Sequence, residues 1–158
     1  MELIVHIGMP KTATTTLQKI YFPLVAKENQ HIEYHGVFQP RGSNKTELYR
    51  VINKYINTGI NLVQSRELLK TYQQKNKVIH IVSEEMIVVS EENTSWRTKT
   101  SRLIELLNGI NYTLLVSVRE PLLGSFSYYV ERYLYFKNKK ISYKQAVNSE
   151  ESIDIYKY

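Results

Sequence analysis

Residues 3–17 read LIVHIGMPKTATTTL, and this stretch decides the fold that we predict. Residues 3–7 form a short apolar run rich in branched side chains, which is typical of a buried strand. Residues 8–10, Gly-Met-Pro, interrupt that run, and apolar residues at helical spacing follow over 14–28. The segment therefore predicts a strand, a tight loop and a helix in direct succession.

The rest of the chain continues this alternation. We expect further strands at residues 32–35, 78–82 and 112–118, and further helices at 47–56, 62–74, from 93–95 to 108–109, at 121–137 and from 142 onward. Three of the strands are continuous apolar runs, which favours a mostly parallel sheet with helices on both faces. We predict an α/β fold with three αβα layers, formed by residues 1–158 as a single domain.

Composition limits the classes of protein that the chain can represent. Its 158 residues are 42% hydrophobic and 23% charged, with no cysteine and a formal charge of +6. The absence of cysteine excludes a disulfide scaffold, a cysteine-ligated zinc site and a thiol nucleophile. No apolar run reaches the roughly 18 residues of a membrane span, and residues 1–6 do not resemble a signal peptide, so we expect a cytoplasmic protein. The pI of 9.4 suits an anionic partner, although a basic surface without a specific partner is equally compatible.

The first predicted loop has the chemistry of an anion site. A strand that leads directly into a helix points free backbone N–H groups and the positive helix end at one place. Lys11 adds a full positive charge, and four threonines between Thr12 and Thr16 add hydroxyl groups. Ordinary N-capping explains one or two of the threonines, but it does not explain Lys11.

Residues 6–18 resemble the 5′-phosphosulfate-binding loop of sulfotransferases that use 3′-phosphoadenosine 5′-phosphosulfate (PAPS). That loop reads Pro-Lys-[Ser/Thr]-Gly-Thr-Thr, and Ala13 stands where the family usually has Gly. A Walker A loop fits poorly, because Lys11 follows Gly8 by three residues and no glycine precedes the helix. The resemblance implies that the 5′ end of PAPS is bound by Lys11, Thr12, Ala13, Thr14, Thr15 and Thr16. Lys11 would also stabilise the leaving phosphate during catalysis.

A second motif follows the predicted strand at 112–118. The family's 3′-phosphate motif reads Arg-x-Pro-x-x-Arg-x-x-Ser-x-Tyr, and Arg119, Pro121, Ser127 and Tyr129 match it, with Gly124 in place of the second Arg. Taken without the resemblance, Arg119 would more simply pair with a neighbouring acid. The resemblance implies that Arg119 and Ser127 hold the 3′-phosphate of PAPS.

Residues 83–85, Ser-Glu-Glu, leave the strand predicted at 78–82. They resemble a Ser-x-Glu found there in bacterial and Golgi-type sulfotransferases, which implies Glu85 as the catalytic base. An exposed acidic turn is equally compatible, and His6, His35 and His80 are alternative bases, although His6 and His80 suit strand positions better. The sequence shows no metal-ligand cluster, and the family's reaction needs no metal.

The resemblance covers roughly residues 3–129 and implies a P-loop-NTPase-like sulfotransferase fold whose C-terminal part is missing. It implies sulfuryl transfer from PAPS to the hydroxyl or amine of an acceptor, a carbohydrate or small molecule that the sequence does not identify. An inactive truncated homologue that only binds the nucleotide and a small P-loop-like nucleotide kinase are alternatives. We expect no nucleic-acid partner, although cations and aromatic residues alternate over 132–144 as in single-strand binders.

Overall fold

The computed structural model describes residues 2–9, 12–36, 46–74, 78–91 and 93–148. Its sheet has four strands in the order β2-β3-β1-β4, and every pair is parallel. The strands are β1 (Glu2–Gly8), β2 (Ile32–Tyr34), β3 (Ile79–Ser83) and β4 (Tyr112–Ser117). The predicted α/β class and the mostly parallel sheet are confirmed.

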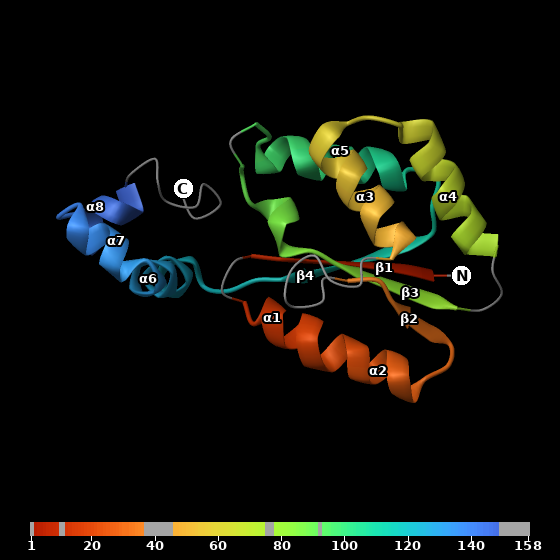
Figure 1. Cartoon of the computed structure of the whole chain (residues 1–158), viewed down its shortest axis with the longest axis horizontal. Helices are drawn as coiled ribbons and strands as arrows, with labels where there is room; N and C mark the ends of the chain where they lie inside the picture. Colours follow the sequence, from red (N-terminus) through yellow and green to blue (C-terminus); the bar gives the residue numbers. More distant parts are fainter. Residues whose placement is uncertain (1, 10–11, 37–45, 75–77, 92, 149–158) are drawn as a thin grey trace.

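The first face of the sheet carries the larger core. Helices α3 (Glu47–Thr58), α4 (Leu62–Gln74) and α5 (Trp96–Leu107) cover this face (Figure 1). Alternate residues of β1 point into it, because successive strand side chains face opposite sides. The buried cluster consists of Leu3, Val5, Ile7, Leu48, Tyr49, Ile52, Tyr55, Ile56, Leu69, Val82, Ile87, Val88, Leu103, Leu106, Leu107 and Ile110.

The second face is covered by one helical run that begins at Thr14. It consists of α1 (Thr14–Thr16), a π-helical segment η1 (Leu17–Tyr21) and α2 (Phe22–Glu28). Pro23 lies at the start of α2, and the chain widens into a π-helical turn just before it. A proline removes one helical hydrogen bond and clashes with the carbonyl four residues earlier, and a wider turn relieves both problems.

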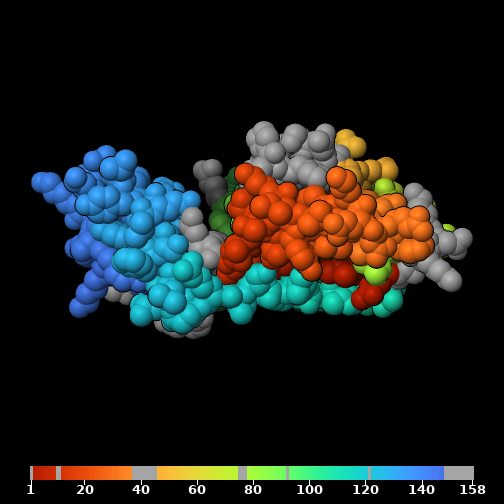
Figure 2. Space-filling view, turned by 90° about the horizontal axis from the view of Figure 1, so that it is seen from below, coloured from red at the N-terminus to blue at the C-terminus, as the bar shows by residue number. Residues whose placement is uncertain are grey.

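The edge strand β4 departs from the expectation of helices over both faces. Leu114, Leu115 and Val116 are 43%, 43% and 46% exposed, and consecutive strand residues point to opposite faces. Figure 2 shows this strand, in teal, open to solvent beside the helical run of 14–28. Apolar residues alone therefore predicted a strand correctly but not its place at the edge of the sheet.

Three short helices extend beyond the carboxyl end of β4 (Figure 1). The helix that we predicted over 121–137 is two helices, α6 (Pro121–Glu131) and α7 (Tyr133–Asn138), divided at Arg132. Helix α8 (Tyr143–Asn148) follows, and both α7 and α8 pack on α6. Among the helices of the described residues, none is both long and apolar enough to cross a membrane.

Candidate functional site

The described residues of the predicted site follow the carboxyl ends of β1, β3 and β4. Met9 N donates to Ser117 O at 2.9 Å, so the loop after β1 starts against the end of β4. Glu84 N donates to His6 O at 3.1 Å, so the segment after β3 starts against β1. Parallel strands end at one edge, and this edge is where α/β sheets bind their ligands.

Gly8 lets the loop after β1 fold back tightly. A Cβ atom at this position would lie 2.3 Å from Thr14 Cγ2, so a larger residue would force Thr14 to move. Thr12 Oγ1 donates to Met9 O at 2.7 Å and closes the bend from the other side. Lys11, which the sequence predicts as the main cation of the loop, lies outside the described residues.

Ala13 opens the helix in a left-handed conformation. Its φ of 60° and ψ of 21° lie in the region that favours glycine, which is the residue usual there in the sulfotransferase loop. The first hydrogen bonds within the helix are donated by Thr16 N and Leu17 N to Ala13 O, at 3.0 Å and 3.2 Å. The amides of Thr14 and Thr15 come before them and have no acceptor within the helix. The backbone therefore accommodates an alanine at this position only with strain.

Ala13→Gly should therefore stabilise the protein by about 1 kcal/mol, because glycine adopts this conformation without the clash that a Cβ atom causes. Urea unfolding of the two proteins measures the difference. Ala26→Gly, inside α2, is the matched control and should destabilise by about 1 kcal/mol or more. A loss of stability in Ala13→Gly equal to that of the control would contradict the strained turn.

Glu85 faces this loop. Thr14 Oγ1 donates a hydrogen bond to Glu85 Oε2, which joins the first loop to the 3₁₀ helix η2 (Glu85–Val88). Glu84 turns instead into the core, where it is buried and accepts hydrogen bonds from Tyr49 Oη and from Met86 N. Glu85 is thus joined to Thr14, whereas Glu84 is joined to Tyr49 and to the backbone of Met86.

Lys99 anchors the segment that carries Glu85, and the sequence analysis did not single it out. This side chain on α5 is buried, and its Nζ donates to Met86 O and Val89 O, both at 3.1 Å. It also pairs with the carboxylate of Glu91. A lysine within an amphipathic helix usually lies in solvent, so no sequence signal pointed to this role.

A buried polar network runs beneath the same edge. His6 Nδ1 contacts Ser83 Oγ and His6 Nε2 contacts Ser117 Oγ, each at 2.7 Å, and Gln18 Nε2 donates to Ser83 Oγ at 3.1 Å. Burial lowers the pKa of His6, and the charge of Glu85 opposes this shift only in part. The ring is therefore neutral near pH 7, donating at one nitrogen and accepting at the other. As predicted, His6 is a strand residue, but it also links three strands.

Arg119 and Ser127 both follow β4. Ser117, at the end of β4, pairs with Gly8, so Arg119 leaves the sheet two residues past the strand that lines the first loop. Arg119 is exposed, and Ser127 is half-buried on α6. That both bind one phosphate group stays a prediction.

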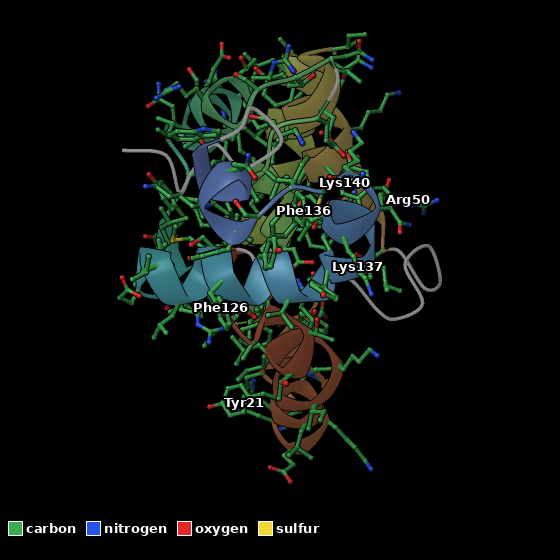
Figure 3. All side chains as sticks on the ribbon, turned by 90° about the vertical axis from the view of Figure 1, so that its left-hand side faces the viewer. Tyr21, Arg50, Phe126, Phe136, Lys137 and Lys140 are labelled. Carbon is green, nitrogen blue, oxygen red and sulfur yellow. The ribbon has the colours of Figure 1, made fainter. Side chains whose placement is uncertain are left out.

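The cations and aromatic residues of 132–144 largely interact with one another. Arg132 and Lys139 lie 4.7 Å and 4.6 Å from the ring of Tyr135, and the buried Phe136 stacks on Tyr129 at 5.2 Å. In Figure 3, Phe136 lies among the helices while Lys137 points outward. These rings form a small local core, which is a structural explanation for the pattern.

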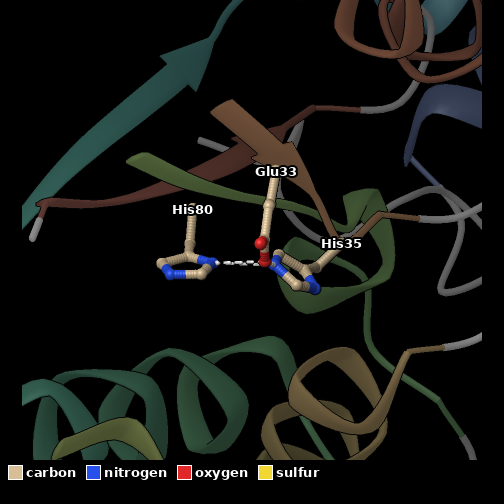
Figure 4. A group of neighbouring side chains, drawn as sticks. All are labelled: Glu33, His35 and His80. Atoms are coloured by element: carbon tan, nitrogen blue, oxygen red, sulfur yellow. Dashed lines mark hydrogen bonds and ion pairs between the residues drawn. The ribbon is translucent and has the colours of Figure 1, made fainter. Parts of the chain in front are cut away.

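The structure also brings together a group that the sequence did not reveal. One ligating atom each from Glu33, His35 and His80 lie within 4.8 Å of one another (Figure 4). The sequence showed no metal-ligand cluster because 45 residues separate His35 from His80, and only the pairing of β2 with β3 joins them.

Comparisons with known proteins add no assignment. No protein-family model matches the chain, and no curated protein matches it significantly. The fold and the site geometry therefore carry the functional argument, together with the motif resemblance.

Proposed function

We propose that the chain binds PAPS at the carboxyl edge of its sheet and transfers the sulfuryl group to the hydroxyl or amine of an acceptor. The observation that carries this proposal is the local geometry at Gly8 and Ala13 on either side of the predicted lysine. Thr14 packs so close to Gly8 that a Cβ atom on Gly8 would meet it, and Ala13 has the left-handed conformation at the position where the sulfotransferase loop usually has glycine. The finer identification as a P-loop-like sulfotransferase fold belongs to the same proposal.

The 5′ end of the donor would contact the start of the helical run. The amides of Thr14 and Thr15 come before the first helical hydrogen bond, where an anion is favoured. The side chains of Thr15 and Thr16 are exposed, so their hydroxyl groups can reach a ligand. The hydroxyls of Thr12 and Thr14 already donate to Met9 O and to Glu85, so their first role is to shape the loop.

Bound PAPS supplies an electrophilic sulfuryl group, and the protein must orient an acceptor and remove its proton. Glu85 is half-buried and reaches the loop through Thr14, so its carboxylate is our candidate to accept that proton. Lys11 would stabilise the negative charge that gathers on the leaving phosphate. Arg119 and Ser127 would bind the 3′-phosphate and thereby discriminate PAPS from nucleotides that lack it.

Thermal unfolding with different nucleotides tests this proposal. At saturating concentration, 3′-phosphoadenosine 5′-phosphate should raise the Tm by about 5 °C or more, because a ligand that binds only the folded state stabilises it. AMP and ATP should shift the Tm much less. Arg119→Ala should remove the advantage of the 3′-phosphorylated nucleotide, whereas Arg50→Ala, on the exposed side of α3, should leave it unchanged.

Each other outcome has a distinct meaning. Equal shifts with AMP and with the 3′-phosphorylated nucleotide would remove Arg119 and Ser127 from the site. A larger shift with ATP and magnesium would favour a nucleotide kinase. Binding of PAPS without any transfer or hydrolysis would favour a nucleotide-binding module, and no shift with any nucleotide would overturn the proposal.

A further inference from the structure

Two histidines and a glutamate converge on the sheet face that α3 and α4 cover. Glu33 on β2 is the direct neighbour of His80 on β3, and His35 follows the end of β2. Glu33 Oε2 lies 3.3 Å from His80 Nδ1 and 3.3 Å from His35 Nε2, and the two nitrogens lie 2.8 Å apart. Figure 4 shows the carboxylate directed at both rings.

Glu33 Oε2, His35 Nε2 and His80 Nδ1 form a triangle, and a hydrogen bond explains the length of only one of its three sides. The contact between the two nitrogens has an ordinary length, but a carboxylate paired with a donor group normally approaches to about 2.7–2.9 Å. One carboxylate oxygen instead lies equally far from both rings. The corners of such a triangle lie about 1.8 Å from a common point, so an ion with bonds of about 2.0–2.2 Å would lie just outside their plane.

The surroundings hold both rings in place. His35 Nδ1 contacts Thr46 Oγ1 at 3.0 Å, so its other nitrogen, Nε2, faces the cluster. Such a partner on the second nitrogen is usual for a metal-ligating histidine. The ring of Tyr72 on α4 meets both imidazoles edge-on, at 5.7 Å from His35 and 5.1 Å from His80.

Burial and charge suit a cation that enters from solvent. Both histidines are buried, whereas the Glu33 side chain is 52% exposed and leaves a route to water. Two neutral imidazoles and one carboxylate compensate one positive charge of a divalent ion. They are also the ligand types that zinc accepts in sites that keep one position open.

We propose that Glu33, His35 and His80 bind a divalent transition-metal ion, with Zn²⁺ as the ion that the ligand set fits best. The ion would join the end of β2 to β3, and through Thr46 it would join both strands to the start of α3. The site uses none of the residues that we assign to PAPS, so the metal proposal and the proposed function can be tested independently of each other.

Zinc binding to the intact chain tests the proposal. Protein cleared of metal with a chelator is titrated with Zn²⁺ in competition with a chromophoric chelator, and Co²⁺ is then substituted so that its visible spectrum reports the ligands. We expect one tightly bound ion per chain. Glu33→Gln, at a partly exposed position, should raise the Kd at least tenfold, and His35→Gln should raise it further.

His31→Gln is the matched control, because His31 is exposed and precedes the same strand outside the cluster. It should leave the affinity for zinc unchanged. Because His35 is buried, far-ultraviolet circular dichroism is used to verify that the His35→Gln variant folds. If that variant does not fold, the Glu33→Gln variant alone tests the proposal. Absence of zinc uptake by the unaltered chain, or equal affinity in the Glu33→Gln and His31→Gln variants, overturns the proposal.

Discussion

Lys11→Ala should reduce the rate of sulfuryl transfer from PAPS by at least about 100-fold, the usual effect of removing one group that stabilises developing charge. Lys11 lies outside the described residues, so this expectation rests on the motif and on the adjoining geometry at Gly8 and Ala13. Transfer of labelled sulfate, or hydrolysis of PAPS without an acceptor, measures the rate. The Tm without ligand should not change.

Lys19→Ala is the matched control for this variant. Lys19 is an exposed lysine in the same helical run, and its removal changes the net charge by the same amount. It should keep at least half of the transfer rate. An unchanged rate in Lys11→Ala, or equal losses in the two variants, would show that Lys11 acts only through general charge and has no part in the reaction.

Lys99→Met should destabilise the protein by about 3 kcal/mol. Methionine fills much of the same space but leaves Met86 O and Val89 O without the donor that Lys99 Nζ provides, and unpaired buried carbonyls are costly. Urea unfolding measures the loss. Lys70→Met, at an exposed position on α4, should change stability by less than about 0.5 kcal/mol.

This variant also tests how Glu85 is positioned. Because Lys99 holds the segment that follows Glu85, amide hydrogen exchange over residues 85–89 should accelerate more than exchange in β1 does. Uniform acceleration across the protein would mean that Lys99 contributes to global stability alone. Unchanged unfolding would show that water replaces the lysine at both carbonyls.

Much of the secondary structure could be predicted because it depends on local patterns. The apolar runs of β1 and β3 and the periodicity of α4, whose bounds match the prediction, need no distant partner to be recognised. The break at Arg132 within the helix predicted over 121–137 was missed. Helical spacing continues through that break, so nothing local predicts it.

The candidate site was predictable only in part. The motif pointed to Thr14 and Glu85, and a hydrogen bond joins these two residues across 71 positions of sequence. The network of His6 with Ser83 and Ser117 was not predicted. Polar residues at strand ends look alike in sequence, and only strand order determines which of them meet.

By itself, the sequence determined the alternation of strands and helices, the parallel sheet and the change from strand to helix between Gly8 and Thr14, because hydrophobic periodicity and turn residues act over short distances. The tertiary structure alone decided that β4 lies at an exposed edge and that Lys99 is buried against the segment that follows Glu85. It also brought His35 and His80 together with Glu33. Those features follow from the order in which strands pair and from how helices pack on them, and such contacts join residues whose separation in sequence carries no signal.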